Sequence, residues 1–240
     1  MHSPFVFHFI TKVLNDKANY PAYQPVENLR QQLLTNETLL EIEDMGAGSG
    51  ISKTTRRSIA SVAKHAAKPK KFGELLYRMA KTYQPRIIIE LGTSLGITTS
   101  YLSLAAPGAK IITMEGAQTV AAVAKENFKK LNLDNVSLAE GNFDHTLSSV
   151  LNGQQSVDLC YIDGNHRREP TERYFQQLLP KINNDSILIF DDIHWSKEME
   201  QAWETIKQHQ AVKCSIDLFF IGIVLFRQEF KEKQHFIIRF

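Results

Sequence analysis

The sequence predicts an α/β fold of the Rossmann-like type: a mostly parallel sheet that ends in a C-terminal antiparallel hairpin, with an N-terminal helical cap. Three observations support this prediction. Short apolar runs alternate with helical segments from residue 86 onward. A glycine-containing turn follows the first of these runs. Two apolar runs lie close together in residues 212–226, as expected for two strands of a hairpin.

The first predicted strand is the β-branched run Ile87–Ile89, which leads into a tight loop. Strands that alternate with helices are joined by right-handed crossovers and form a mostly parallel sheet. Residues 1–80 lack this alternation and are interrupted by prolines, so we expect a helical cap or lid over 1–80 and a Rossmann-like domain over 81–240. The further strands are predicted at 110–114, 136–139, 157–162 and 186–190, and the helices at 98–105, 120–131, 146–151, 171–179 and 198–209.

The composition is that of a globular protein with one main domain and an appendage. The chain has 240 residues, 43% of them hydrophobic and 22% charged, with a net charge of +2. Apolar runs such as 187–190 and 218–226 are far shorter than the roughly 20 residues that span a bilayer, so no membrane span is expected. We do not expect residues 1–10 to be a secretion signal, because they have no basic leader and no small-residue cleavage site, and Cys160 and Cys214 lie in apolar runs that favour free thiols. These features predict a cytoplasmic protein.

Three features of the predicted cap allow alternative interpretations. Residues 46–72 hold no acidic residue and carry seven lysines and arginines. They form either a solvated helical face or a patch for an anionic substrate, a lipid head group or RNA. The glycines of residues 46–50 form either a hinge of a lid or a simple loop, since no strand precedes them as in a cofactor loop. The aromatic residues Phe5, Phe7 and Phe9 pack either against the core or against a partner subunit in a homodimer.

Ligands of open α/β sheets bind beyond the carboxyl ends of the strands, so the residues after each strand carry the functional prediction. After the first strand, Gly92 and Gly96 permit a sharp turn and the close approach of a ligand to backbone amides. Ser94 stands where a nicotinamide-dinucleotide motif has its second glycine, which disfavours that cofactor. Glu115 ends the second strand, 23 residues past Gly92, where a carboxylate accepts hydrogen bonds from ribose hydroxyls.

The loop after the third strand offers a second group of candidate cofactor contacts. Asn142 and the backbone beside it could contact a purine edge. Phe143 either packs on the purine ring or belongs to the core.

The segment Glu90–Thr99 resembles the first motif of class I S-adenosylmethionine-dependent methyltransferases, in particular the small-molecule O-methyltransferases related to catechol and caffeoyl-CoA enzymes. That family has a similar E-I-G-T followed by a small residue and G-Y-S-T. The resemblance covers roughly residues 85–230 and continues in order through Glu115, Gly141-Asn142, Asp163 and Asp191-Asp192.

The resemblance implies a seven-stranded sheet, an S-adenosylmethionine pocket at the first two strands, and an acceptor pocket covered by the N-terminal helices. A nucleic-acid partner is disfavoured, because the sequence has neither a dedicated RNA-binding module nor an Asn-Pro-Pro-Tyr-like motif. The acceptor is then a small molecule. The residues expected to bind the cofactor are Glu90, Gly92, Thr93, Ser94, Gly96, Glu115, Gly116, Asn142, Phe143 and Asp163.

The ends of the fourth and fifth strands carry three carboxylates, those of Asp163, Asp191 and Asp192. Converging carboxylates repel one another unless a proton or a cation lies between them, and hard oxygen ligands suit Mg²⁺ or another divalent cation. The resembling enzymes have Asp-Asn where this chain has Asp191-Asp192. The alternative is that Asp163 faces the methionine end of the cofactor and Asp191 caps the following helix.

His166 lies three residues after Asp163, where the resembling metal-dependent enzymes have the lysine of D-x-x-K as general base. An imidazole is suited to proton transfer near neutral pH. We therefore expect His166 and Asp163 to be the catalytic residues, with His194 as the rival base and Trp195 as a candidate wall of the acceptor pocket. The leading function is O-methylation of a small hydroxylated molecule. The alternatives are a noncatalytic cofactor-binding scaffold and an N- or RNA-methyltransferase.

Overall fold

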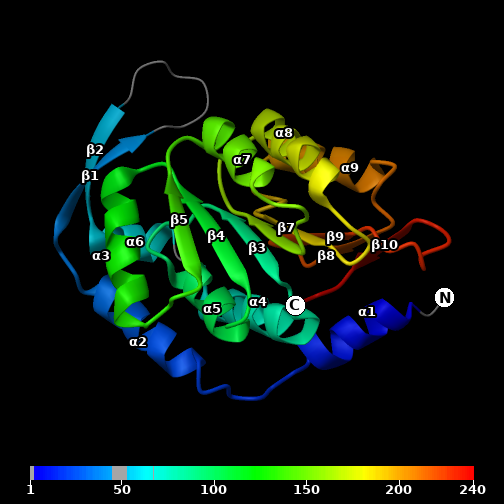
Figure 1. The fold of residues 1–240 in the computed structure, drawn as a ribbon, viewed down its shortest axis with the longest axis horizontal. Helices are drawn as coiled ribbons and strands as arrows, with labels where there is room; N and C mark the ends of the chain where they lie inside the picture. Colours follow the sequence, from blue (N-terminus) through cyan, green and yellow to red (C-terminus); the bar gives the residue numbers. More distant parts are fainter. Residues whose placement is uncertain (1–2, 45–52, 67) are drawn as a thin grey trace. The chain divides into compact units, whose positions relative to one another are not determined.

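The structure, a computed structural model, describes residues 3–44, 53–66 and 68–240 and confirms the α/β fold class (Figure 1). Its main sheet has eight strands in the order β10-β8-β9-β7-β6-β3-β4-β5, one strand more than the expected seven. By contacts the chain divides into two compact units, which are described separately.

The first unit consists of residues Met1–Arg86 and Thr93–Asn142. Strands β4 and β5 pair in parallel, with Glu115 opposite Glu140 at their ends. The elements of this unit are α1 (Pro4–Phe9), the π-helix η1 (Ile10–Leu14), α2 (Tyr23–Leu34), β1 (Leu39–Asp44), β2 (Lys53–Ser58), α3 (Ile59–Ala66), α4 (Lys70–Tyr83), α5 (Ile97–Ala105), β4 (Lys110–Glu115), α6 (Gln118–Lys130) and β5 (Val136–Glu140).

Buried polar contacts attach the N-terminal helices of this unit to α4 and α5. The buried Arg78 of α4 donates a hydrogen bond of 2.7 Å to the carbonyl of Val13 in η1. The buried Tyr101 of α5 donates to Glu27 of α2 at 2.7 Å. Gly73 lets α4 approach α5 closely, because a Cβ there would lie 2.5 Å from the ring of Tyr101. The predicted cap is therefore anchored by specific partners rather than by apolar contact alone.

Within the predicted helical cap, β1 and β2 form an antiparallel hairpin that the sequence analysis did not predict. Opposite charges face each other across the hairpin, and Arg56 pairs with Glu41 at 2.6 Å. The backbone of Glu41 also accepts a hydrogen bond of 2.7 Å from Thr119 at the start of α6, beside which β1 lies in Figure 1. Part of the basic stretch thus lies on a strand with acidic partners. The glycines of residues 46–50 lie outside the described residues.

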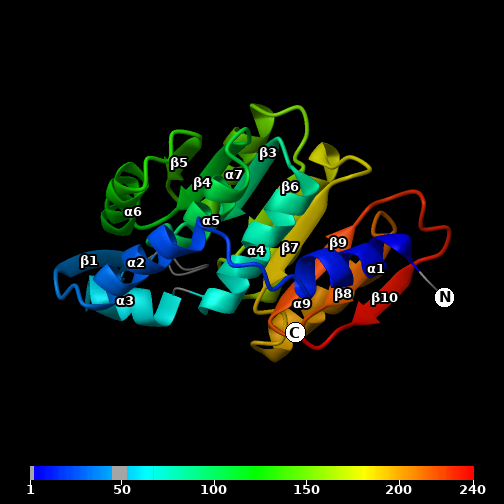
Figure 2. The same cartoon turned by 90° about the horizontal axis from the view of Figure 1, so that it is seen from below.

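The second unit consists of residues Ile87–Gly92 and Phe143–Phe240. Strands β3, β6 and β7 are parallel, and β9 pairs antiparallel with both β7 and β8, which confirms the predicted hairpin (Figure 2). The elements are β3 (Ile87–Leu91), α7 (Phe143–Asn152), β6 (Leu159–Ile162), α8 (Arg168–Leu178), the 3₁₀-helix η2 (Leu179–Lys181), β7 (Ile187–Asp191), α9 (Lys197–Gln208), β8 (Cys214–Asp217), β9 (Ile221–Leu225) and β10 (Gln234–Ile237).

The additional strand is β10, which pairs in parallel with β8. Its residues alternate between half-buried and exposed positions, and charged residues precede it. An edge strand of this kind buries little apolar surface and has no continuous apolar run. That is why the sequence pattern did not predict it.

The structure shows which of the cysteines and N-terminal aromatic residues are buried. Cys160 and Cys214 are buried free thiols, and burial raises the pKa of Cys214 to about 12. Phe9 is buried and Phe5 stacks on Tyr83 with ring centroids 5.3 Å apart, whereas Phe7 is exposed. Among the described helices, none is both long and apolar enough to span a bilayer.

Candidate functional site

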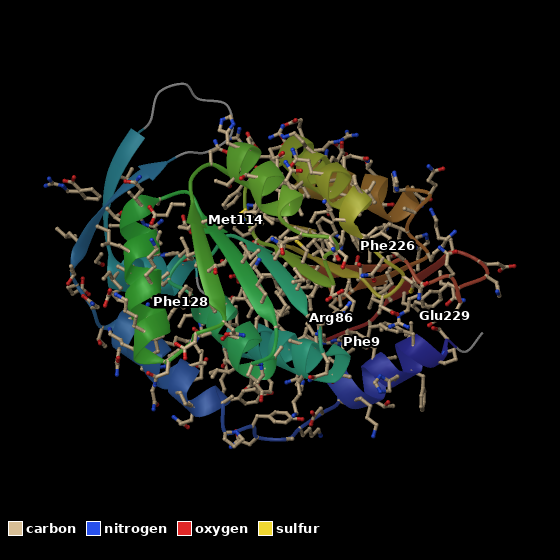
Figure 3. All side chains as sticks on the ribbon, viewed as in Figure 1. Phe9, Arg86, Met114, Phe128, Phe226 and Glu229 are labelled. Carbon is tan, nitrogen blue, oxygen red and sulfur yellow. The ribbon has the colours of Figure 1, made fainter. Side chains whose placement is uncertain are left out.

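In the first unit, the loop Thr93–Gly96 makes a tight turn into α5. Ser94 and Gly96 have left-handed backbone conformations, with φ of 48° and 82°, and the Gly96 amide donates to the Thr93 carbonyl at 2.9 Å. The Thr93 amide donates to the carbonyl of Met114 on β4 at 3.0 Å. Met114 is labelled in Figure 3, as is Phe128. A Cβ at Gly96 would lie 2.5 Å from the ring of Phe128 on α6. The predicted loop is therefore held against β4 and α6.

Glu115 is tied to this loop by its carboxylate. Oε2 accepts a hydrogen bond from the Ser94 amide at 2.8 Å, and Oε1 accepts one from the Ala117 amide at 3.0 Å. Burial raises the pKa of Glu115 above its usual value, against the opposing effect of the amides of Ala117, Ser94 and Gly116. A carboxylate has about four acceptor positions, so this one keeps acceptor capacity beside its hydrogen bonds from the amides. That capacity suits the two adjacent hydroxyls of a ribose.

In the second unit, the end of β3 lies directly against the end of β6. The Asp163 amide donates to the Leu91 carbonyl at 2.8 Å. Gly92 has a φ of +100°, and a Cβ there would lie 2.0 Å from the backbone oxygen of Asp163. Glu90, at the same end of β3, is fully buried. The structure thus brings the β3 turn together with the loop that carries the predicted catalytic residues.

The predicted catalytic residues Asp163 and His166 also lie together. His166 Nε2 is 3.4 Å from Asp163 Oδ1, and 35% of the His166 side chain is exposed. The hydroxyl of Tyr161 donates to Asp163 Oδ2 at 3.3 Å, and burial raises the pKa of Tyr161 well above its usual range. Both contacts are longer than a strong charge-assisted hydrogen bond. Asp163 is therefore positioned to orient the imidazole without holding it rigidly.

Phe143, at the start of α7, packs on the loop that follows β6. Its ring lies 2.5 Å from where a Cβ of Gly164 would be, and it makes an edge contact with Tyr174 at 6.2 Å between centroids. The ring is half-buried and belongs to this local contact. Its contact with a purine stays a prediction, as does that of Asn142.

The three carboxylates of the expected cation site do not form a metal-binding cluster. Pairing of Ile162 with Phe190 places Asp163 and Asp191 after neighbouring residues of β6 and β7. Asp191 is buried, whereas Asp192 is half-buried and has a left-handed backbone with φ of 52°. In the described part of the chain, no three or more His, Cys, Asp or Glu side chains are grouped so that they could hold a metal ion. These residues do not fit a cation in this arrangement, and the cation stays a prediction.

His194 has a partner that the sequence analysis missed, the carboxylate of Asp217. His194 Nε2 lies 2.9 Å from Asp217 Oδ2, and Nδ1 lies 3.5 Å from Glu200. The indole of Trp203 donates to Asp217 Oδ2 at 3.2 Å, and the Phe219 amide donates to Oδ1 at 2.8 Å. Asp217 ends the short strand β8, outside any motif. Only its place at the end of a strand parallel to β7 could have indicated it.

Three exposed aromatic residues, Trp195, Phe219 and Phe220, follow β7 and β8 and are called the aromatic rim here. The exposed fractions are 74% for Trp195, 62% for Phe219 and 46% for Phe220. The imidazole of His194 stacks on Phe219 with centroids 5.4 Å apart, and Phe219 contacts the edge of Phe220 at 5.0 Å. The rim follows β7 and β8, so it lies at the carboxyl edge of these strands. Large exposed apolar groups at such an edge indicate a binding surface.

Comparison with known proteins finds similarity to methyltransferases. Residues 89–193 match a family model described as a methyltransferase domain. A catechol O-methyltransferase of Niastella koreensis is 28% identical over 124 residues, which are 50% of this chain and 55% of that protein. A tRNA (guanine-N(7)-)-methyltransferase of Mycoplasma mobile is 33% identical over 76 residues, 32% of this chain and 38% of that protein. The chain thus spans about half the length, or less, of these curated relatives.

The similarity of fold extends over a longer part of the chain. The crystal structure of the S-adenosylhomocysteine-bound methyltransferase PaMTH1 of Podospora anserina is similar with a TM-score of 0.65 at 14% identity, covering 95% of this chain and 98% of that one. The glycine turn and the acidic residues at the strand ends, described above, are consistent with these similarities in sequence and fold. The match of residues 89–193 to a methyltransferase domain and the similarity to catechol O-methyltransferases support an S-adenosylmethionine-dependent methyltransferase of class I that resembles the small-molecule O-methyltransferases.

Proposed function

We propose that the protein transfers the methyl group of S-adenosylmethionine to an oxygen of a small hydroxylated molecule. The observation that carries this proposal is the contact between Gly92 and the backbone of Asp163. It joins the glycine turn of a cofactor loop to a loop that bears a carboxylate and an imidazole. Binding of a methyl donor and deprotonation of an acceptor then take place at the same edge of β3 and β6.

The described residues fit the cofactor by their chemistry. Glu115 is the acceptor for the ribose hydroxyls, because both of its oxygens are oriented by backbone amides and retain free acceptor positions. Gly92 leaves the backbone open to close approach, and Asn142 and Phe143 are the candidate contacts of the adenine. When bound, S-adenosylmethionine supplies an electrophilic methyl group on a sulfonium.

The acceptor hydroxyl must lose its proton to become an effective nucleophile. His166 takes this proton as general base, and the carboxylate of Asp163, 3.4 Å away, stabilises the imidazolium that forms. The new bond joins the acceptor oxygen to the methyl carbon, the bond from sulfur to that carbon breaks, and the proton remains on His166. No step is assigned to a divalent cation, because the carboxylates do not form a group that could hold one.

The aromatic rim supports an acceptor with an apolar, flat part. Trp195, Phe219 and Phe220 are exposed beyond the strands that precede them. Aromatic rings of this kind stack on planar apolar groups and lose little conformational entropy when they do so. The rim is therefore the proposed wall of the acceptor site.

Titration of the purified protein with S-adenosylhomocysteine tests the cofactor. We expect micromolar binding of S-adenosylhomocysteine by isothermal titration calorimetry, and none of NADH, because Ser94 interrupts the dinucleotide motif. The titrations are done with Mg²⁺ and with EDTA, and the cation is expected to leave the affinity unchanged. Failure to bind S-adenosylhomocysteine, or binding of NADH instead, would overturn the proposal.

Single substitutions of the two candidate histidines identify the general base. We expect His166→Ala to lower the rate of methyl transfer by about 100-fold to 10,000-fold and to leave the affinity for S-adenosylhomocysteine unchanged. The measurement is transfer of a radiolabelled methyl group to a panel of hydroxylated small molecules, with and without EDTA. His194→Ala is the matched comparison, and its rate is expected to fall less than that of His166→Ala. A larger loss in His194→Ala would assign the base to the His194–Asp217 pair instead.

The same assay tests the alternative acceptor class. A relative named for tRNA methylation matches part of the chain, so tRNA is included in the panel. The exposed Arg56 of β2 is already paired with Glu41, which favours a small molecule over RNA. If tRNA alone is labelled, the proposal of a small-molecule acceptor is rejected, whereas the proposal of methyltransferase activity stands.

A further inference from the structure

Tyr174 of α8 is a buried tyrosine whose hydroxyl connects two loops of the second unit. Its exposed fraction is 0%. The side-chain amide of Asn165 donates to the Tyr174 hydroxyl at 2.6 Å. The hydroxyl in turn donates to Asp144 Oδ1 at 2.8 Å. One hydroxyl thus joins the loop after β6 to the first turn of α7.

Each end of this chain of hydrogen bonds lies beside a proposed functional residue. Asn165 lies between Asp163 and His166, and its backbone is left-handed with φ of 64°. A conformation of this kind needs support from the surrounding structure, although asparagine tolerates it better than most residues. Asp144 directly follows Phe143, the candidate contact of the adenine.

The charges around the hydroxyl fix the direction of donation. Burial and the hydrogen bond to Asp144 raise the pKa of Tyr174 to about 12, so the hydroxyl keeps its proton. Burial would raise the pKa of Asp144, but hydrogen bonds from Arg173 and Tyr174 outweigh it and lower that pKa. Arg173 donates to Asp144 Oδ1 at 2.6 Å and pairs with Glu169 one turn earlier. Asp144 therefore stays an ionised acceptor that is anchored by an arginine.

We propose that Tyr174 is a positioning residue that couples the start of α7 to the loop Asp163–His166, so that a cofactor contact at residues 142–144 orders the loop that carries the general base. The inference rests on the proposed function for the identity of the cofactor. The coupling itself rests on the hydrogen bonds through Tyr174. The Phe143 ring, which packs on Gly164, provides a second contact between the same two segments.

Replacement Tyr174→Phe removes the bridging hydroxyl and keeps the ring. In the free protein we expect amide hydrogen exchange of residues 164–167 to become about 5-fold faster, the effect of one lost hydrogen bond of ordinary net strength. With S-adenosylhomocysteine bound, we expect residues 143–147 and 164–167 both to be protected in the wild type. In the variant, protection is expected to remain at 143–147 and to be lost at 164–167. In turnover, kcat falls while KM for S-adenosylmethionine changes little.

Tyr101→Phe is the matched control. Tyr101 is equally buried and donates to a carboxylate, Glu27, at a similar 2.7 Å, but it lies in the first unit outside the site. It is expected to leave exchange at residues 164–167 unchanged. Asn165→Gly is the second variant, because glycine adopts the left-handed backbone readily and lacks the side-chain amide that donates to Tyr174. Its amide hydrogen exchange at residues 164–167 should be as fast as in Tyr174→Phe. The variant that carries both substitutions should exchange little faster than either single variant.

Several outcomes would overturn the inference. The first is unchanged exchange at residues 164–167 in both Tyr174→Phe and Asn165→Gly. The second is a change at these residues in Tyr101→Phe that equals the change in Tyr174→Phe. The third is that S-adenosylhomocysteine still protects residues 164–167 in Tyr174→Phe. A wild type that does not bind S-adenosylhomocysteine would reject the proposed function, whereas the exchange of the free variants would still decide whether Tyr174 couples the two segments.

Discussion

Replacement Glu115→Ala is expected to weaken S-adenosylhomocysteine binding by about 100-fold or more. Hydrogen bonds to a charged group contribute about 1.5–3 kcal/mol each, and the proposed ribose contact has two of them. The substitution also leaves the amides of Ser94 and Ala117 without the acceptor that they have in the structure. The loop Thr93–Gly96 then loses one of its attachments to β4. Isothermal titration calorimetry measures the loss directly.

Glu140→Ala is the control for this substitution. Glu140 is paired in register with Glu115 at the end of the neighbouring strand, but its carboxylate contacts Lys125 at the surface. Its replacement is expected to change the affinity less than 3-fold, since exposed ion pairs contribute only about 0.2–1 kcal/mol. Equal affinity of Glu115→Ala and the wild type would reject the assignment of Glu115 to the ribose.

The raised pKa of Glu115 gives the binding a pH dependence of known sign. Burial raises the folded-state pKa above the usual value of 4.5. The stabilisation of the free protein by neutral Glu115 is fully present below pH 4.5 and is lost as the pH rises through the folded-state pKa. Binding of the ribose has the opposite dependence, because it needs the ionised carboxylate. Affinity for S-adenosylhomocysteine should therefore fall on acidification in the wild type and not in Glu115→Ala.

Replacement Gly92→Ala is expected to lower the free energy of unfolding by about 3 kcal/mol or more and to abolish S-adenosylhomocysteine binding. A left-handed backbone costs a residue with a Cβ about 1–3 kcal/mol, and overpacking adds a similar amount. The Cβ would lie 2.0 Å from the backbone oxygen of Asp163, which cannot rotate away as a side chain would. The strands β3 and β6 must then separate at their ends. Urea denaturation, followed by circular dichroism, measures the change in stability.

Gly108→Ala is the matched control for Gly92→Ala. No atom lies within 4 Å of a Cβ built on Gly108, and its φ is not in the left-handed region. Its free energy of unfolding should stay within about 0.5 kcal/mol of the wild type. If Gly92→Ala is as stable as this control, the close approach of Gly92 to Asp163 does not exist in solution.

The sequence pattern predicted the elements that bury continuous apolar runs. The strands that end near Glu115, Asp163 and Asp191 appear within a few residues of their expected positions, because a buried parallel strand needs such a run. The turn at Gly92 was predicted for the same reason, since glycine provides the left-handed backbone that the turn requires. Local sequence pattern was therefore sufficient to predict the elements whose conformation depends mainly on their own residues.

The missed features depend on partners far apart in the chain. Strands β1 and β2 are stabilised by charges that face each other only after pairing, as in Glu41 with Arg56. Asp217 and Tyr174 are ordinary residues of a strand and a helix until the fold places His194 and Asn165 beside them. No periodicity or motif reports such contacts. The expected cation site is the opposite case, a grouping that the sequence predicted and the structure does not have. The three carboxylates at neighbouring strand ends do not form a cluster that could hold a metal ion.

The burial of both cysteines makes the protein a convenient scaffold for chemical labelling. The chain has two cysteines, and both thiols are buried with raised pKa values, so neither supplies a reactive thiolate at neutral pH. A maleimide reagent should therefore leave the native protein unmodified. A cysteine introduced at an exposed position such as Lys197, two residues after Trp195 of the aromatic rim, would be the sole point of attachment for a fluorophore or a spin label, without removal of either native cysteine.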